Sequence, residues 1–531
     1  MGLKFNWIDT NNNIMEKEDK YSRLLSEGGL FFYGPNKGSF ILPPCGYALW
    51  KNIQSILDKK FSSRGVQNVL LPTLIPLDLL EKEKKHIAGF SPECYYVERI
   101  GEKKTETPLV LRPTSEVMFY DWYRQTLHSY RQLPFLYNQW CSVFRAEKST
   151  SPFFRNTEFL WQEGHTIHAS EQEAQQFTLN ILDDYRNYAE NTLCLGVIVG
   201  KKTEGEKFAG ALETYTVECL LPDGQCLQFA TSHYFGDNFC RLMQVKFQNK
   251  DNQMQYPFST SWGTSTRAIG AVAKTHADNW GLILPFDIAP VQIAFILIGE
   301  NEELINYYQE ISDLLTPYYR CQLYNKSSRV NLNILQADKE GCPFKIILGM
   351  EELKKGEITL VRRDNVERKI TVSLESSETE KNFLRNFENN LAENLEEHNL
   401  EDKSQEQLNA ERNEIVNSAR KGLKKDKIIK VIKQEIVGFQ KNLYQKSADF
   451  RDSYIFPVNN FSELEKKIKV GVKGLFLVPF CNNLECEETF KRKVPSYSIR
   501  CIALGEKIIE PQPCLFCQLS AKHMVYLGRS Y

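Results

Sequence analysis

TEFLWQEGHTIHA, residues 157–169, is the part of the chain that says most about its architecture. If this run forms a β-strand, alternate side chains share one face of a sheet. One face then carries two aromatic rings, a carboxylate, an imidazole and an aliphatic chain, from Phe159, Trp161, Glu163, His165 and Ile167. Such a face suits a pocket that stacks a flat group and binds a cation or a hydrogen-bond donor. A half-buried strand with a satisfied Glu–His pair is an equally good explanation.

A second strand is predicted just before this run, at residues 135–147, which read FLYNQWCSVFRAE. Two antiparallel strands joined by a short loop would bring Arg145, Glu147, Arg155 and Glu158 together. An arginine can hold a phosphate or carboxylate through two parallel hydrogen bonds, and a glutamate can accept one from an exocyclic amine. For each Arg–Glu pair taken alone, a surface ion pair is the commoner explanation.

A third informative segment is SWGTSTR at residues 261–267, which opens a predicted helix of small residues over 266–279. Small residues allow another backbone or a ligand to approach closely. Arg267 at the start of the helix opposes the helix dipole, and an anionic ligand would relieve that opposition. The alternative is that Arg267 is an exposed arginine that binds no ligand.

Other elements are predicted from the spacing of hydrophobic residues and from residues that begin or end helices and strands. Helices are predicted at residues 46–65, from about 112–116 onward, and from Ser170 to about residue 195, where Ser170 and Glu173 form a capping box. A strand at residues 66–71 should end before Pro72. Strand-like and helical runs alternate over residues 286–375, which predicts a small α/β domain.

The composition is that of a folded globular protein. Among 531 residues, 66 are basic and 67 acidic, so the net charge of −1 argues against a polycationic binder. Hydrophobic residues make up 42% of the chain, and no run approaches the roughly 18 apolar residues of a membrane span. The first residues contain no apolar signal core, so we expect a cytoplasmic protein without a membrane partner.

Cysteine spacing predicts one metal site near the end of the chain. Of 14 cysteines, nine are scattered singly and are expected to be structural thiols in a reducing compartment. Two close pairs, Cys481 with Cys486 and Cys514 with Cys517, offer four thiolates for a structural tetrahedral zinc site. Cys501 could replace one ligand, and free thiols are the alternative to zinc.

Three parts of the chain resemble, in order, the signature motifs of class II aminoacyl-tRNA synthetases. The first motif would be the helix and strand that end at Pro72, the second runs from Phe144 to Phe159, and the third ends at Arg267. Further pieces resemble prolyl-tRNA synthetases in particular: RPTSE (112–116), EFLWQEGHT (158–166), KFAG (207–210), TSH (231–233), THADNWGLILPFDIAPVQ (275–292) and LGRSY (527–531). The short span between the second and third motifs is similar to the archaeal and eukaryotic-like form, which lacks the bacterial editing insertion.

The resemblance implies an α+β fold with an antiparallel catalytic sheet. We expect the catalytic domain at residues 1–285, an α/β anticodon-binding domain at 286–375, a charged helical connector at 376–441 and a C-terminal zinc-binding α/β domain at 442–531. The segment of the first motif usually builds a twofold interface in this class, so a homodimer is expected.

The activity implied by the resemblance is ATP-dependent ligation of L-proline to tRNA(Pro) in two steps through prolyl-adenylate. Magnesium would neutralise the leaving pyrophosphate, and zinc would be structural. Arg145 and Arg267 would be the catalytic residues. ATP would be bound by Arg145, Glu147, Arg155, Phe159, Gln228, Thr231, Ser265 and Arg267. Proline would be bound by Thr114, Glu116, Arg145, Trp161, Glu163, His165, Phe208 and His233.

The anticodon-binding region departs from the family pattern, because Ile347 stands where a glutamate is usual and a Pro-Arg-Asp sequence is lost. Lys345, Arg362 and Arg363 remain candidate tRNA contacts. The basic stretch 420–433 either touches the RNA backbone or is a solvated helix face, and the second is the commoner case.

Three other functions compete with proline ligation. A threonyl- or seryl-specific synthetase is disfavoured by the WQEGH and TSH pieces. A catalytically silent tRNA-binding paralogue would normally lose Arg145 or Arg267, and it is disfavoured because both arginines are present. A nucleic-acid-binding zinc protein is disfavoured by the net charge and the long catalytic-type region, so no DNA partner is expected.

Overall fold

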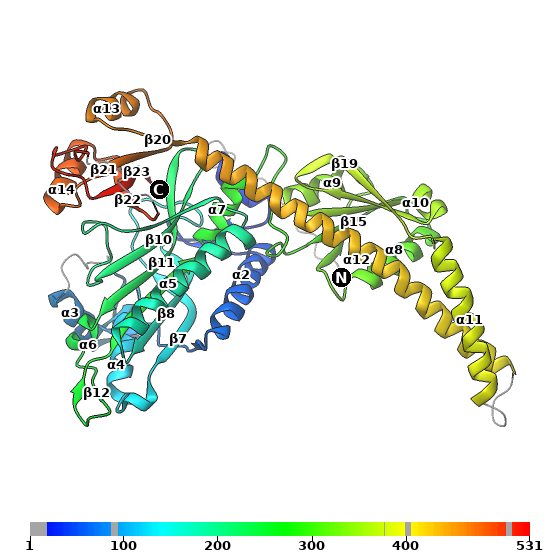
Figure 1. Cartoon of the computed structure of the whole chain (residues 1–531), viewed down its shortest axis with the longest axis horizontal. Coiled ribbons are helices and arrows are strands. Elements are labelled where there is room, and N and C mark those ends of the chain that lie inside the picture. Colours follow the sequence, from blue (N-terminus) through cyan, green and yellow to red (C-terminus); the bar gives the residue numbers. More distant parts are fainter. Residues whose placement is uncertain (1–18, 87–93, 376, 399–404, 506–511) are drawn as a thin grey trace. The chain divides into compact units, whose positions relative to one another are not determined.

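Figure 1 shows the chain as a computed structural model that describes residues 19–86, 94–375, 377–398, 405–505 and 512–531. The chain divides into two compact units. The first contains the described residues up to Ala277 together with Tyr444–Tyr531, and the second is Asp278–Leu443. None of the described helices combines the length and the apolar sequence that a membrane span requires.

The first unit is built on one large sheet, which has eleven strands within the described part of the chain. In spatial order these are β20 (Ile455–Pro457), β21 (Leu475–Phe480), β23 (His523–Ser530), β22 (Ser498–Ala503), β9 (Val197–Lys201), β10 (Glu213–Leu220), β11 (Gln225–Gly236), β14 (Phe258–Ser265), β8 (Glu158–His168), β7 (Phe135–Phe144) and β3 (Gln67–Asn68). The strands from β9 to β7 pair antiparallel, as expected for the catalytic sheet.

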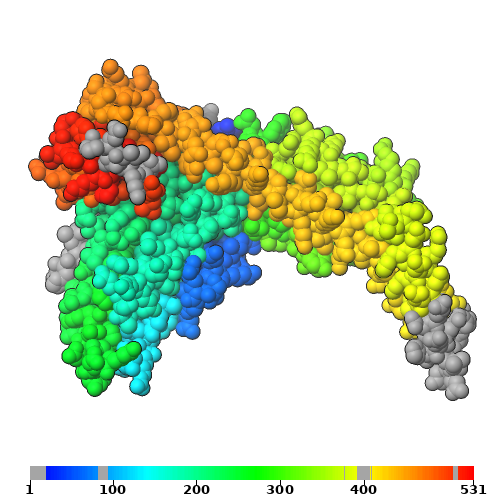
Figure 2. All heavy atoms as spheres, viewed as in Figure 1, coloured from blue at the N-terminus to red at the C-terminus, as the bar shows by residue number. Residues whose placement is uncertain are grey.

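The C-terminal strands continue this sheet without a break in hydrogen bonding. Strand β22 pairs with β9 through Ile502 opposite Lys201 and Ala503 opposite Gly200. Strand β23 pairs with β22 and also, in parallel, with the beginning of β11. Figure 2 shows the orange-to-red C-terminal segment lying directly against the body of the same unit. The end of the chain therefore belongs structurally to the large sheet.

The two strands that the sequence predicts around the second motif are confirmed. Strands β7 and β8 form an antiparallel hairpin in which Phe144 lies opposite Glu158 and Gln139 opposite Glu163. Strand β8 also pairs with β14, where Trp161 lies opposite Ser265. This register brings the second and third motifs together at one end of neighbouring strands.

The predicted helices of the first unit are present at the expected positions, and they differ from the prediction at their ends. They are α1 (Lys20–Glu27), α2 (Pro44–Ser63), α3 (Leu77–His86), α4 (Glu116–Thr126), η2 (Tyr130–Gln132), α5 (Glu171–Asn187), η3 (Tyr188–Thr192), α6 (Asn238–Leu242), α7 (Arg267–His276), α13 (Phe461–Lys469) and α14 (Leu484–Lys493). The Ser170 side chain accepts a hydrogen bond from the backbone of Glu173, as the capping box predicts. The α-helix that begins there ends at Asn187, earlier than predicted, because its last turn is a π-helix.

The predicted strand at residues 66–71 is wrong in length, because only Gln67–Asn68 pair with β7. The next residues leave the ladder when the Leu71 amide donates to the Gln139 side chain and the Arg112 guanidinium donates to the Leu71 carbonyl. Smaller strands complete the unit: β1 (Phe32–Tyr33), β2 (Phe40–Ile41), β4 (Leu74–Pro76), β5 (Tyr96–Ile100), β6 (Lys103–Leu111), β12 (Phe247–Gln248) and β13 (Met254–Gln255).

The second unit is an α/β domain, as predicted for residues 286–375. Its mixed five-stranded sheet has the order β16 (Cys321–Leu323), β15 (Ile293–Ile298), β17 (Phe344–Gly349), β18 (Glu357–Arg362) and β19 (Asn365–Ser373). The helices are α8 (Glu302–Leu315), α9 (Val330–Lys339), α10 (Met350–Lys355), α11 (Glu378–His398) and α12 (Gln405–Ser453). Helix α12 runs past residue 441, so the predicted charged connector ends inside a continuous helix.

Candidate active site

A cavity of about 250 Å³ opens over β8, β11 and β14. It brings together most of the predicted site residues: Thr114, Glu116, Arg145, Phe159, Trp161, Glu163, His165, Phe208, Gln228, Thr231, His233, Ser265 and Arg267. The remaining two, Glu147 and Arg155, line a smaller hollow of about 20 Å³ that Arg145, Phe159, Ser265 and Arg267 also line. The predicted residues therefore form one continuous site.

The strand-face argument for residues 157–169 is confirmed in its geometry. Phe159, Trp161, Glu163 and His165 all line the cavity, as alternate residues of one strand should. The fifth residue of that face, Ile167, is buried in the adjoining apolar core with Phe119 and Phe235. The face thus passes from the cavity into the core along a single strand.

A buried acid–imidazole group closes one part of the cavity. The His165 Nε2 atom lies 3.2 Å from a Glu163 carboxylate oxygen, which also accepts from the Ser115 amide at 3.2 Å. Burial acts to raise the pKa of Glu163, but the hydrogen bonds from His165, Ser115 and Gln139 hold that pKa below its ordinary value. Glu163 is therefore a charged carboxylate within the protein interior.

Glu116 lies beside this pair, and its surroundings raise its pKa, whereas the pKa of Glu163 is lowered. Its carboxylate accepts a hydrogen bond from the Thr114 hydroxyl, and it begins α4. Burial raises the pKa of Glu116, and the neighbouring negative charge of Glu163 raises it further. A cation bound beside Glu116 would stabilise its charged form.

The Arg145 guanidinium lies between two aromatic rings. Its central carbon is 5.5 Å from the ring centroids of both Phe159 and Trp161, and its Nε atom donates to the Pro113 carbonyl at 3.1 Å. Burial lowers the pKa of Arg145. Since guanidinium groups stay protonated in proteins, the site holds a half-buried positive charge.

Arg267 supplies a second positive charge at the start of α7. Its Nε atom donates to the Phe154 carbonyl at 3.0 Å, and an Nη atom donates to the Gln228 carbonyl at 3.4 Å. Burial, together with repulsion from Arg145 and Arg155, lowers its pKa to about 10. Within the described residues no carboxylate forms an ion pair with Arg145 or Arg267, so the three converging arginines favour an anionic ligand.

His233 occupies the side of the cavity formed by β11. Its Nδ1 atom lies 3.0 Å from the Thr214 hydroxyl, and its ring centroid is 4.8 Å from that of Phe208. Burial lowers the pKa of His233 to about 3, so the ring is neutral at physiological pH. It contributes shape and a hydrogen bond rather than charge.

The sequence prediction missed several cavity-lining residues. Lys202 and Glu206 come from the loop after β9, while Thr214, Ser261 and Gly263 come from strands β10 and β14. The strand residues could have been found from their alternation with the predicted ones. Nothing local marks Lys202 or Glu206, because the loop is placed by contacts with residues far along the chain.

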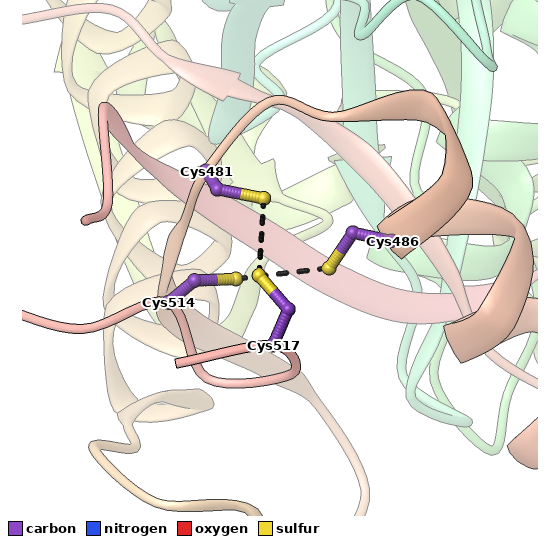
Figure 3. A group of neighbouring side chains, drawn as sticks. All are labelled: Cys481, Cys486, Cys514 and Cys517. Carbon is purple, nitrogen blue, oxygen red and sulfur yellow. Dashed lines mark hydrogen bonds between the residues drawn. The ribbon is translucent and has the colours of Figure 1, made fainter. Parts of the chain in front are cut away.

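The four predicted metal ligands converge, as Figure 3 shows. The Sγ atoms of Cys481 and Cys517 are 3.6 Å apart, and those of Cys486 and Cys514 are 3.8 Å apart. A tetrahedron of Zn–S bonds of about 2.3 Å has edges of about 3.8 Å, so the four thiols fit zinc. Cys501 lies in a different apolar cluster, against Gly200, and so the prediction that it could replace a ligand is wrong.

A second acidic group satisfies the geometric requirement for a metal less well. One ligand atom from each of Glu116, Glu163 and His165 lies within 4.8 Å of the others. These atoms already bond to one another or to Thr114 and Ser115, so their protein partners occupy the directions a cation would need. We regard this group as part of the organic-ligand site.

The prediction that Lys345, Arg362 and Arg363 contact tRNA is wrong, because the three side chains are buried. Their exposed fractions are 2%, 6% and 2%. Lys345 pairs with Asp338, Arg362 with Asp364 and Glu435, and Arg363 with Asp278. These three charges stabilise the second unit internally.

Three families match successive parts of the chain. The family described as tRNA synthetase class II core domain (G, H, P, S and T) matches residues 95–276. The family described as anticodon binding domain matches residues 292–380, and prolyl-tRNA synthetase, C-terminal, matches residues 462–531.

Similar proteins match over nearly the whole chain. A proline--tRNA ligase of Mycoplasma mycoides is 40% identical, and proline--tRNA ligase 2 of Bacillus cereus is 37% identical, each over 96% of both chains. The solved prolyl-tRNA synthetase of Cryptosporidium parvum, complexed with halofuginone and AMPPNP, has a TM-score of 0.81 and 29% identity over 96% of this chain and 94% of that one. The same enzyme complexed with L-proline and AMP has a TM-score of 0.80. The chain therefore belongs to the prolyl-tRNA synthetase family of class II aminoacyl-tRNA synthetases.

Proposed function

We propose that this site ligates L-proline to tRNA(Pro) in two steps, using ATP. The observation that carries the proposal is the shared cavity, in which two half-buried guanidinium groups lie beside a pocket of carboxylates and aromatic rings. One part suits the phosphates of a nucleotide, and the other suits a small ring with a cationic nitrogen. A proline and an ATP molecule would meet between them.

In the first step, a carboxylate oxygen of proline attacks the α-phosphorus of ATP. A P–O bond forms, the bond to the bridging oxygen breaks, and pyrophosphate leaves with its electron pair. The attacking carboxylate is already ionised, so the step needs no general base. Arg145 and Arg267 stabilise the charge that develops on the phosphate, and Arg145 also orients the proline carboxylate.

The proline subsite is assigned to residues around β8. Glu116 and Glu163 lie where they can hold the secondary ammonium, and their buried carboxylates support that role. Trp161 and Phe208 form walls for the ring. Thr114 fixes the Glu116 carboxylate, His165 fixes Glu163, and His233 fills the side next to Phe208.

The nucleotide subsite is assigned to the other end of the cavity. Phe159 stacks on adenine, Glu147 accepts from its exocyclic amine and Arg155 contacts the terminal phosphates. Gln228, Thr231 and Ser265 line the cavity near Arg267, which favours contacts with the sugar and phosphates. Magnesium bound to ATP would neutralise the charge of the pyrophosphate that leaves.

In the second step, a terminal ribose hydroxyl of tRNA(Pro) attacks the prolyl carbonyl and AMP leaves. The second unit supplies anticodon binding. Its contacts with the tRNA are made by accessible side chains and not by the buried cations Lys345, Arg362 and Arg363.

Several finer features belong to the same proposal. The chain takes the form without an editing insertion, and support comes from the described residues between Arg155 and Ser261, which form strands and helices of one compact unit. The four-cysteine cluster holds a structural zinc ion that cross-links β21, α14 and the turn before β23. We also propose a homodimer whose twofold interface is built by the segment of the first motif, and a cytoplasmic location, as expected for an enzyme that supplies the ribosome.

Charging of tRNA(Pro) tests the proposal directly. Purified protein should transfer labelled proline to tRNA(Pro) in the presence of ATP and magnesium. The kcat of the Arg267→Ala variant should be about 10²–10³-fold lower than that of wild type, which is the loss typical of a removed transition-state contact. The matched control Arg131→Ala alters an exposed arginine and should charge normally. Wild-type protein that charges no tRNA(Pro) would contradict the proposal.

A further inference from the structure

The loop at residues 202–208 forms a wall of the cavity but has few backbone contacts of its own. Lys202, Glu206 and Phe208 line the cavity. The loop leaves the sheet after β9. Its internal backbone hydrogen bonds run from the Glu206 and Lys207 amides to the Thr203 carbonyl, at 3.1 and 3.0 Å, and the Phe208 amide at its end donates to the Thr214 hydroxyl at 3.0 Å. Such a loop needs other contacts to keep one conformation.

Those contacts come from α14, which lies almost three hundred residues later in the chain. The buried Glu487 carboxylate accepts from the Thr203 hydroxyl at 2.9 Å and from the Gly205 amide at 3.3 Å. The fit is close, because a Cβ atom on Gly205 would lie 2.8 Å from the Glu487 carboxylate. A larger residue at 205 would therefore displace the end of the Glu487 side chain.

Lys491, one helical turn after Glu487, holds the same loop through charge. Its Nζ atom lies 2.8 Å from the Glu206 carboxylate and donates to the Gly205 carbonyl at 3.2 Å. It is also 3.6 Å from Glu487. Lys491 thus pairs with a carboxylate that lines the cavity, although Lys491 itself does not line it.

The beginning of the loop is held by the C-terminal strands as well. The Lys202 ammonium donates to the Arg500 carbonyl at 2.6 Å and pairs with Glu218 at 2.5 Å. The Arg500 guanidinium pairs with the other oxygen of Glu218 at 2.7 Å. Both ends of the loop segment 202–206 are therefore fixed by residues 487–500.

We propose that Glu487 and Lys491 are positioning residues that fix the 202–208 loop and so set the affinity of the site for proline. This inference rests on the proposed function, because it assigns the loop to the proline side of the cavity. When Lys491 or Glu487 is altered, the loop visits conformations in which Glu206 no longer lines the pocket. Proline then binds only the fraction of molecules with an ordered loop, and its apparent affinity falls by that fraction.

The inference predicts a separation of kinetic constants. Proline has to order the loop, so the KM for proline rises. ATP contacts are assigned to β8, β14 and α7, so the KM for ATP stays the same. Once proline is bound the loop is in place, so kcat changes little. A variant that merely unfolded part of the protein would instead lower the active fraction and therefore kcat.

Steady-state ATP–pyrophosphate exchange with Lys491→Ala and Glu487→Gln tests this. We expect the KM for proline to rise at least about fivefold in each variant, with kcat and the KM for ATP within about twofold of wild type. Lys491→Arg should restore most of the affinity. The matched controls Lys493→Ala and Glu488→Gln alter exposed charges of the same helix and should behave as wild type.

Hydrogen exchange of the free protein gives a readout that does not depend on activity. Backbone amides at residues 203–208 should exchange faster in Lys491→Ala than in wild type or Lys493→Ala, while those of β8 should not change. Unchanged loop exchange, or a proline KM within twofold of wild type in both test variants, would overturn the inference. A wild-type protein without proline-dependent exchange would overturn the proposed function instead, and the hydrogen-exchange comparison would still test the loop.

Discussion

The Arg155 guanidinium donates a hydrogen bond to the main-chain oxygen of Tyr531 at 2.9 Å, which connects the second-motif loop to the end of β23. The Tyr531 ring packs against Phe154 with centroids 4.1 Å apart, and its hydroxyl lies 3.1 Å from the Ser151 hydroxyl. The Lys274 ammonium is 4.6 Å from the same ring centroid. Tyr531, the residue after β23, thus contacts four residues around the nucleotide subsite.

Tyr531→Ala should therefore weaken ATP binding more than proline binding. The substitution removes the ring and hydroxyl contacts that hold residues 151–155, where Arg155 is assigned to the terminal phosphates. Loss of roughly 1 kcal/mol, the net value of one hydrogen bond, corresponds to about a fivefold rise in the KM for ATP. Exchange kinetics with Ser530→Ala as control check this, and an unchanged KM for ATP would show that the contact is irrelevant to binding.

Glu116 makes proline activation sensitive to acid. Its pKa is raised above the ordinary 4.5 by burial and by Glu163, whereas the pKa of Glu163 is lowered. As the pH falls through the raised pKa, Glu116 gains a proton and loses the charge that binds the proline ammonium. The value of kcat/KM for proline, which reports the free enzyme, should fall at a higher pH than an ordinary glutamate would cause.

Glu116→Gln is the control for this pH dependence. The variant should have a much lower kcat/KM for proline and should lack the acid limb, while its thermal unfolding stays close to that of wild type. A pH profile that is identical in Glu116→Gln would exclude Glu116 as the titrating group.

The cysteine cluster should bind about one zinc ion per chain. Cys514→Ser should lose the metal and lower the melting temperature by several degrees, because structural zinc contributes directly to folding free energy. Cys501→Ser is the matched control: its thiol is buried in a separate cluster, so the variant should keep the metal. Metal analysis of purified wild-type protein that finds no zinc or other bound metal would contradict the assignment.

The basic stretch 420–433 is expected to contribute little to tRNA binding. Arg420, Lys424 and Lys427 form ion pairs with Glu388, Glu310 and Glu380 at 2.8, 2.8 and 2.7 Å. These pairs favour the earlier alternative of a solvated helix face. Replacing Lys421, Lys425 and Lys430 by glutamine should leave the affinity for tRNA and its salt dependence unchanged. A shallower salt dependence would instead assign phosphate contacts to the stretch.

The sequence predicted the site best where local periodicity determines the direction of side chains. The alternation from Phe159 to His165 identified the cavity wall, because a strand places every second residue on one face. Family resemblance added Thr114, Phe208 and His233, which no spacing argument joins to β8. The hairpin of β7 and β8 then brought these segments to one cavity.

The failures have a common physical cause, which is partners that are distant in sequence. Arg363 was predicted to be a free cation, but Asp278, 85 residues earlier in the chain, forms an ion pair with it. Residues 69–71 were predicted as part of a strand, but the Leu71 amide donates to the Gln139 side chain instead of to a strand partner. The sequence did not predict Glu206 as a cavity residue, because Lys491, its ion-pair partner, comes from α14.

The most direct test of the central claim is amino-acid-dependent ATP–pyrophosphate exchange with proline, alanine, cysteine and threonine compared in one experiment. The shared cavity of Arg145, Arg267, Glu116 and Trp161 predicts that proline supports exchange with the highest kcat/KM, and that Glu116→Ala abolishes this exchange without unfolding the protein. Exchange that prefers threonine, or near-normal proline-dependent exchange by Glu116→Ala, would contradict the account.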